Sequence, residues 1–364
     1  MKTPDLKSKH PETIRDLNEK PAIDTVTTNS LEKIPFFSVC IPTYNRASFL
    51  PQAIESVLTQ DFTDFELVIC DNASNDNTQA VVEKYQDRRI RYVRYENLVG
   101  MYANHNRCID LARAEWLVFL HSDDSFGINA FNIINTKINS FPELDILLQS
   151  ANNSGFMSDL ERLISFSITN ENKLSWQSII LILTNDGFPP SGGVFRKIKF
   201  ESIGLFDESY FCLANKNYCY WSDTALELLW IIKGGNIVIS NDFWIDYSKG
   251  SQSAFQQMLS SPSYYKAHKI VFDTFFNEYK DTKIDDVVAI LKELPTGKQI
   301  LFLKRCFQSG YKKYALLIEH KLHISFKECW ADRNYKYHVF PLKIMPEVYW
   351  QILTTFKWIK SWSK

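Results

Sequence analysis

The chain has 364 residues, of which 45% are hydrophobic and 23% are charged, and its formal net charge is −1. This length allows one large core or two smaller ones, and the composition is that of an ordinary globular protein. A nucleic-acid partner usually requires a basic excess, so the charge balance argues against one. Residues 1–33 are polar and lack the apolar centre of a signal peptide, and we expect a flexible lead there.

Between residues 34 and 150, short apolar runs alternate with segments in which apolar residues recur at helical spacing. Strands that alternate with helices form parallel sheets with helices on both faces. We therefore predict an α/β, Rossmann-like fold with a mainly parallel sheet. The predicted strands are 36–41, 65–70, 90–95, 116–120 and 146–148, and the predicted helices lie near 50–58, 80–85, 101–112 and 128–138.

The rest of the chain has a looser pattern up to about residue 260 and is mostly helical from 261 to 364. We predict one domain over residues 34–260, followed by a helical extension. The later predicted strands are 192–196 and 237–239, and the later predicted helices are 175–183, 199–203 and 222–232.

Residues 341–364 mix large apolar side chains, including tryptophans, with lysines. Such a mixture on a helix is typical of an interfacial membrane anchor, and the alternative is a terminal helix packed on the core or on a partner subunit. No apolar run reaches the roughly 20 residues that a bilayer span needs.

The seven cysteines show no pair with the spacing of a zinc site. Cys40, Cys70 and Cys108 lie in apolar stretches, which predicts buried free thiols. A reducing, cytoplasmic setting fits this pattern, with peripheral contact at the inner face of the membrane if the 341–364 segment is an anchor.

Polar residues gather where four of the predicted strands end. Ligands of an open parallel sheet bind outside the carboxyl ends of its strands, so these residues are the candidates for a binding site. Each group also has a structural interpretation as a turn, a helix cap or a solvated helix face. The groups are Pro42, Thr43, Tyr44, Asn45 and Arg46, then Asp71 to Asp76, then Asn104 and Arg107, then His121, Ser122, Asp123 and Asp124.

Asp123 and Asp124 are adjacent carboxylates at the end of an apolar strand. They repel one another and are costly to desolvate unless a cation lies near. A divalent cation bound to phosphate oxygens would supply that charge, although a helix N-terminus also attracts acids. Side chains alternate along a regular strand, so either the backbone turns here or only one carboxylate contacts the ion.

In order and spacing, these segments resemble the family 2 glycosyltransferases. The likeness runs from about residue 36 to 150 and continues more thinly to 253. It implies a GT-A fold, a UDP-sugar or other nucleotide-sugar donor, a divalent metal (Mn²⁺ or Mg²⁺) and inversion at the anomeric carbon. It divides the domain into a nucleotide-sugar-binding half (34–150) and an acceptor-binding half (151–260).

The resemblance also implies roles for single residues. Asp71 would accept a hydrogen bond from the base, and Asn104 or Arg107 would border the nucleotide. Ser122 and Asp123 end the family's Asp-x-Asp motif, so Asp123 is the favoured metal ligand and Asp124 the second candidate. The residues expected against the base and ribose are Pro42, Thr43 and Tyr44, with Arg46 and His121 as further donor-binding candidates.

The chain departs from the family pattern twice. His121 stands where the motif usually begins with Asp, and the alternative to a donor-binding role is a buried histidine bonded to backbone. Ser222 precedes Asp223 where many members have a Glu-Asp pair, after a loop matched here by residues 204–208. We predict that Asp223 is the general base, with a helix N-cap as the competing interpretation.

The predicted function is sugar transfer from a nucleotide diphosphate, with UDP favoured, to a hydroxyl of a glycan or lipid-linked saccharide in cell-surface polysaccharide synthesis. The alternative is a non-catalytic relative that binds nucleotide sugar or glycan. A dehydrogenase is excluded because no Gly-x-Gly-x-x-Gly turn is present. We expect residues 188–193 to form a loop over the donor sugar. Trp176, Trp221, Trp230 and Trp244 are either core residues or sugar-stacking platforms.

Overall fold

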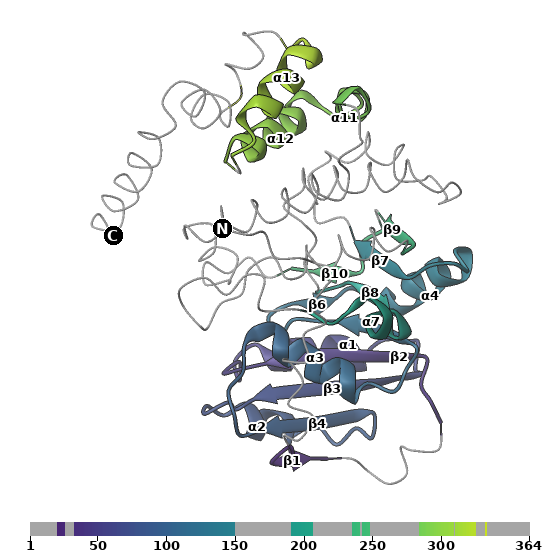
Figure 1. Ribbon diagram of the computed structural model, residues 1–364. Coiled ribbons are helices and arrows are strands. Elements are labelled where there is room, and N and C mark those ends of the chain that lie inside the picture. The colour runs from purple at the N-terminus through teal and green to yellow at the C-terminus, as the bar shows by residue number, and fades with distance from the viewer. Residues whose placement is uncertain are drawn as a thin grey trace. The chain divides into compact units, whose positions relative to one another are not determined.

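The chain divides into two compact units by the proximity of its Cα atoms. The first comprises Met1–Met157 and Phe188–Gly250, and the second comprises Ser158–Gly187 and Ser251–Lys364. No helix in the described part of the chain is both long and apolar enough to span a membrane. The computed structural model describes residues 20–25, 33–149, 191–206, 235–240, 242–247, 284–308, 310–324 and 332 (Figure 1).

An eight-stranded sheet in the order β1-β4-β3-β2-β5-β8-β7-β9 forms the frame of the first unit (Figure 1). Its centre is parallel, because β2 pairs in parallel with both β3 and β5, and β3 pairs in parallel with β4. The predicted α/β fold with a mainly parallel sheet is confirmed. The central strands are β2 (Phe37–Thr43), β3 (Phe65–Asn72), β4 (Ile90–Tyr95) and β5 (Trp116–Phe119).

The sheet is mixed beyond β5, which the simple alternation of strands and helices did not predict. β8 (Val194–Arg196) lies antiparallel between β5 and β7 (Ile146–Gln149), and β7 pairs in parallel with β9 (Ile237–Ser240). The predicted strand at 146–148 is therefore present but does not extend the parallel series. A strand from later in the chain separates it from β5.

Successive side chains of β2 point to opposite faces of the sheet, and helices pack on both faces. Phe37, Val39 and Ile41 belong to one buried cluster, to which α1 (Leu50–Leu58) and α4 (Ala130–Ser140) contribute their apolar sides. Ser38 and Cys40 face the other way, toward α3 (Met101–Leu111) and the residues after it. The α3 helix packs on β2 and β3.

Of the remaining described helices, α2 and α7 are the shortest, with 5 and 7 residues. α2 is shorter than predicted, and three helices of the second unit confirm the helical character of the C-terminal region. The predicted helices at 175–183 and 222–232 and the 341–364 segment lie outside the described residues. The bounds are α2 (Thr78–Val82), α7 (Lys197–Ile203), α11 (Ile284–Lys292), α12 (Thr296–Gln308) and α13 (Lys312–Leu322).

Three two-residue strands escaped sequence analysis because they are too short to show a period. β1 (Ile23–Asp24), within the expected flexible lead, pairs antiparallel with β4. An ion pair of 2.7 Å between Arg91 and Asp24 accompanies this pairing. β6 (Ser125–Phe126) pairs with β10 (Ile245–Asp246) and so joins the segment after β5 to a distant part of the chain.

The prediction of buried free thiols is confirmed for Cys40, Cys70 and Cys108. Burial raises the pKa of the Cys108 thiol well above its ordinary value, so this group stays protonated. These cysteines therefore behave as small apolar core residues.

Glu66 is a buried carboxylate that ties β2 and β3 to the segment after α3. Its Oε1 accepts hydrogen bonds from the Ser38 hydroxyl at 2.6 Å and the Arg113 backbone N–H at 2.7 Å. Its Oε2 accepts one from Arg113 Nε at 2.7 Å. We expect Glu66→Ala to lower the free energy of unfolding by about 2–3 kcal/mol, because buried donors lose their acceptor.

Urea denaturation measures this effect, and Glu83→Ala is the matched control. The Glu83 carboxylate is exposed and, within the described residues, accepts a hydrogen bond only from the Gln79 side chain, so its loss should change stability by less than about 0.5 kcal/mol. Equal effects of the two substitutions would contradict a special role for Glu66.

Candidate functional site

The chain reverses direction immediately after β5, at residues 121–124. The Asp124 N–H donates to the His121 carbonyl oxygen at 3.0 Å, which closes a four-residue turn. The Leu120 N–H donates to the Cys40 carbonyl at 2.9 Å, so the turn starts beside the carboxyl-terminal half of β2. Of the two alternatives for Asp123 and Asp124, a regular strand or a backbone turn, the structure shows the turn.

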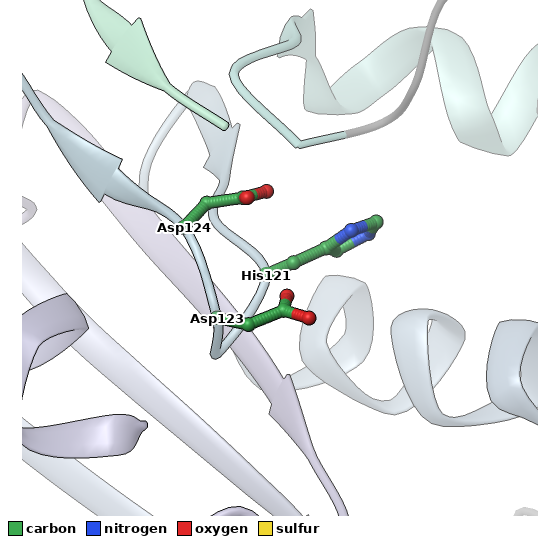
Figure 2. A group of neighbouring side chains, drawn as sticks. All are labelled: His121, Asp123 and Asp124. Atoms are coloured by element: carbon green, nitrogen blue, oxygen red, sulfur yellow. The ribbon is translucent and has the colours of Figure 1, made fainter. Parts of the chain in front are cut away.

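This turn brings three potential metal ligands together. One ligand atom each of His121, Asp123 and Asp124 lie within 4.8 Å of one another. Figure 2 shows that the three side chains project to the same side of the turn. His121 and Asp123 are half-buried and Asp124 is buried. Two carboxylates and one imidazole form a donor set that fits a divalent cation.

Ser191 holds the turn from a distant part of the chain. Its Oγ accepts a hydrogen bond from the His121 N–H at 2.9 Å and donates to Asp124 Oδ2 at 2.6 Å. The next residue, Gly192, has φ +82°, and a Cβ there would meet the Ile245 side chain at 2.7 Å. A glycine is therefore required for this segment to pass close to β10.

The segment around Ser191 is further fixed by two aromatic side chains. Trp244 Nε1 donates to the Gly192 carbonyl at 2.8 Å, and the Tyr247 hydroxyl donates to the Ser191 carbonyl at 3.1 Å. Trp244 is fully buried, which supports its interpretation as core. The described part of the predicted 188–193 loop thus lies against the Asp124 carboxylate. Trp176, Trp221 and Trp230 lie outside the described residues.

His121 contacts a second histidine, His105, which comes from α3. Their Nε2 atoms lie 3.2 Å apart, and His105 Nδ1 lies 2.8 Å from the Met101 carbonyl oxygen. Burial, with a further contribution from the neighbouring His121, lowers the pKa of His105 to about 3, so its ring is neutral. The alternative that His121 bonds only to backbone through its ring does not hold.

The loops after β2 and β3 are joined by several hydrogen bonds. Asn45, at φ 53°, donates its N–H to Ser74 Oγ at 2.9 Å and accepts the Asn75 N–H at 2.9 Å through Oδ1. Asp76 accepts the N–H groups of Ala47 and Thr78 at 3.1 and 3.0 Å. These contacts give Asn45 and Asp76 a structural role at the edge of the sheet.

Thr43 and Asp71 are register partners on the adjacent parallel strands β2 and β3. The Thr43 hydroxyl oxygen is buried and has no hydrogen-bond partner within the described residues. A buried hydroxyl without a partner is costly, and a bound ligand at this edge could supply one. Tyr44 follows with 41% of its surface exposed, and Pro42 and Arg46 are half-buried.

Asp71 is fully buried, and both of its carboxylate oxygens are engaged. Oδ1 accepts the Ser74 N–H at 2.9 Å, and Oδ2 accepts the Tyr92 hydroxyl at 2.5 Å. Burial and the Asp71 carboxylate raise the pKa of Tyr92 well above its ordinary value, so the phenol stays protonated and donates. Each carboxylate oxygen has a second lone pair, so Asp71 retains capacity for a further donor.

Asn104 and Arg107 lie on α3, and neither simply faces solvent. The Asn104 amide is buried and exchanges two hydrogen bonds with Cys70, one with its carbonyl at 2.9 Å and one with its thiol at 3.3 Å. The Arg107 guanidinium donates to Asn72 Oδ1 at 3.0 Å and lies 3.9 Å from the centre of the Tyr95 ring. Their contact with a nucleotide stays a prediction.

Three residues of the site escaped notice in the sequence: His105, Asn106 and Tyr92. The Asn106 amide exchanges two hydrogen bonds with the Phe206 backbone, at 2.8 and 3.1 Å, and so holds residues 204–206 against α3. A signal for the first two was present, because four consecutive polar residues (104–107) cannot all face solvent on one helix. Tyr92 gave no such signal.

Asp223, the predicted general base, lies outside the described residues.

Part of the chain is similar to known glycosyltransferases. Residues 38–190 match the model of the family described as glycosyl transferase family 2. A Campylobacter jejuni protein named GalNAc(5)-diNAcBac-PP-undecaprenol beta-1,3-glucosyltransferase is 38% identical over 109 residues, 29% of this chain and 35% of that protein. An Escherichia coli protein named UDP-Glc:alpha-D-GlcNAc-diphosphoundecaprenol beta-1,3-glucosyltransferase is 31% identical over 120 residues, 33% of this chain and 43% of that protein. The chain thus spans less than half of the length of either relative.

Two solved structures share the fold. A mannosyltransferase from Pyrobaculum calidifontis, in complex with GDP-Man and Mn²⁺, has a TM-score of 0.52 at 13% identity and covers 90% of this chain and 88% of its own. S. aureus TarS 1-349 in complex with UDP-GlcNAc has a TM-score of 0.50 at 18% identity, with coverages of 79% and 89%. At these identities the likeness establishes the fold, which is GT-A-like. Residues 38–190 thus match glycosyl transferase family 2, within a chain whose fold is GT-A-like.

Proposed function

We propose that this protein transfers a sugar from a nucleotide diphosphate, with UDP favoured, to a hydroxyl of a glycan or lipid-linked saccharide, with inversion. The observation that carries the proposal is the common edge at the ends of β2, β3 and β5. There the Thr43 hydroxyl, which has no hydrogen-bond partner among the described residues, and the buried Asp71 lie on adjacent strands, and the turn with Asp123 begins beside β2. Pro42, Tyr44 and Arg46 follow directly on β2 and are proposed to border the nucleotide.

Asp123, Asp124 and His121 would hold a divalent cation, Mn²⁺ or Mg²⁺. When bound, such an ion stabilises the negative charge that grows on a departing diphosphate. Asp124 is fixed by Ser191, whereas Asp123 is half-buried and makes no hydrogen bond to another side chain in the part of the chain that the structure describes. Ser122 lies between His121 and Asp123 and is buried, so it is proposed to act through the shape of the turn.

The proposed reaction is a direct displacement. The acceptor oxygen forms a bond to the anomeric carbon while the bond from that carbon to the phosphate oxygen breaks, and its electron pair leaves with the nucleoside diphosphate. The hydroxyl proton goes to the carboxylate of Asp223, the proposed general base. Asn104 and Arg107 are proposed to border the nucleotide from α3.

The class of acceptor is inferred from the relatives. Two of them are named as glucosyltransferases that act on undecaprenol-linked saccharides. An acceptor anchored in a membrane would explain an interfacial segment at residues 341–364, and we propose peripheral contact at the inner face of the membrane on that basis.

Incubating the full chain with UDP-glucose, UDP-GlcNAc or GDP-mannose and Mn²⁺, and detecting the released nucleoside diphosphate, tests the proposal. Release that depends on the sugar nucleotide and on the ion supports a transferase. Binding of a nucleotide sugar without release of nucleoside diphosphate, in the presence of lipid-linked acceptors, would support the non-catalytic alternative. The reason for that alternative is that His121 replaces the usual leading Asp of the motif.

The hydroxyl of Tyr92 is expected to orient Asp71 toward the base. Tyr92→Phe removes its 2.5 Å hydrogen bond, and we expect UDP to bind about 3–10-fold more weakly, because a carboxylate with one donor fewer is held less firmly. Isothermal titration with UDP measures the change.

Tyr85→Phe is the matched control, because the Tyr85 hydroxyl bonds to Glu55 on the exposed side of α1. It should leave UDP affinity unchanged. An unchanged affinity in Tyr92→Phe as well would remove Tyr92 from the proposed site.

A further inference from the structure

The contact between His105 and His121 defines where their protons lie. The Met101 carbonyl can only accept, so His105 Nδ1 must carry a proton to bond to it at 2.8 Å. His105 is 1% exposed, and a buried imidazole carries a single proton unless a negative partner stabilises the second. Its Nε2 therefore presents a lone pair to His121 Nε2, 3.2 Å away. His121 must donate there through Nε2, so in the neutral ring of His121 the single proton lies on Nε2 and Nδ1 carries a free lone pair.

The ring of His105 is held in this orientation by its surroundings. It packs against the rings of Phe119, Phe206 and Tyr102, with centroid distances of 5.3, 5.5 and 5.4 Å. The Phe206 backbone is itself fixed by two hydrogen bonds with the Asn106 amide, one accepted from Nδ2 and one donated to Oδ1. A ring packed on several sides cannot turn to offer its other nitrogen to His121.

We propose that His105 is a positioning residue that keeps His121 in the Nε2–H tautomer, with Nδ1 free to bind an ion together with Asp123 and Asp124. The site then selects a first-row transition ion such as Mn²⁺ over Mg²⁺. This inference rests on the proposed function in one respect, since it assumes that the three side chains hold the ion of a glycosyltransferase.

The preference follows from ligand chemistry. Mg²⁺ is a hard ion that favours oxygen ligands and binds imidazole poorly, whereas the lone pair of an imidazole nitrogen suits transition ions. A ligating histidine usually donates its other N–H to a fixed acceptor, and loss of that acceptor typically weakens metal binding about 10–100-fold. Here the acceptor is another imidazole, reached from α3.

Nitrogen NMR of the metal-free wild-type chain, labelled with ¹⁵N-histidine, tests the tautomer of His121. The His121 signals are assigned by their absence from His121→Asp. At a pH at which His121 is neutral, we expect a protonated Nε2 and an unprotonated Nδ1. A neutral His121 with its proton on Nδ1 would overturn the proposal, and this readout remains decisive if the His105 variants fail to fold.

Binding of Mn²⁺ in the presence of UDP, followed by electron paramagnetic resonance and by competition with Mg²⁺, tests the selectivity. His105→Leu should weaken Mn²⁺ binding by about 10–100-fold, whereas His105→Gln, whose amide oxygen can accept from His121, should restore most of it. His121→Asp should shift the preference toward Mg²⁺. His320→Gln, in α13, is the control for removing a histidine and should change nothing. Unchanged Mn²⁺ affinity in folded His105→Leu contradicts the proposal.

Release of nucleoside diphosphate, measured in parallel, separates this inference from the proposed function. Release by the wild type at equal rates with Mg²⁺ and Mn²⁺, unaffected by His105→Leu, would leave the transferase standing and overturn the role of His105. Mn²⁺ binding that depends on His105, with no release from any donor tested, would uphold the metal site and contradict the transferase.

Discussion

Replacing Asp123 with alanine is expected to lower the rate of nucleoside diphosphate release by about 10²–10³-fold, because a developing negative charge loses part of its stabilisation. Asp123 lies in a closed turn, and the hydrogen bond that closes it joins the backbones of His121 and Asp124. The substitution therefore removes a carboxylate without removing the contact that shapes the turn. Affinity for Mn²⁺ in the presence of UDP should fall together with the rate.

Asp64→Ala is the matched control for this substitution. Asp64 precedes β3, at the opposite end of the strands, and its carboxylate pairs with Lys33 at 3.1 Å on the surface. Its loss should leave both the rate and the affinity for Mn²⁺ unchanged. Full activity of a folded Asp123→Ala protein would show that this carboxylate does not serve the reaction, and the assignment of the site would fail.

The parallel core of the fold could be predicted because local sequence determines it. The strands β2 to β5 are short apolar runs, and the helices between them show a clear period, so the order of elements fixed the type of sheet. The antiparallel insertion of β8 could not be predicted in the same way. A long segment separates β8 from its partners β5 and β7 in the sequence. The residues of β8 do not indicate whether it pairs parallel or antiparallel with them.

The candidate site was predictable where its residues follow a strand, as Thr43, Asp71 and Asp123 do. The contacts that orient them come from elsewhere in the sequence. Tyr92 and Ser191 bond to carboxylates 21 and 67 residues away along the chain. Such contacts depend on the register of the sheet and on the path of the chain, and a local sequence motif contains no information about either.

The structure changes the interpretation of His121 more than that of any other site residue. In the sequence this residue was a departure from the Asp-x-Asp pattern. Its place in the turn puts its ring beside both carboxylates, and its bond to His105 connects it to the interior of α3. An imidazole can take the position of the missing carboxylate as an ion ligand only if its free nitrogen faces the ion, which is what a fixed tautomer provides.

Substituting Asp223 with asparagine is expected to reduce sugar transfer by about 10²–10⁴-fold while UDP binds with unchanged affinity. Asparagine caps a helix as well as aspartate does, so this change removes the base but keeps any capping function. Asp246→Asn, at an exposed carboxylate in β10, is the control and should transfer at the wild-type rate. Rates of transfer to an added acceptor, with UDP affinity measured by titration, distinguish the interpretations. If Asp223→Asn kept the full rate and only Asp223→Ala lost stability, by about 1 kcal/mol, the residue would be a helix cap and the base would have to be sought elsewhere.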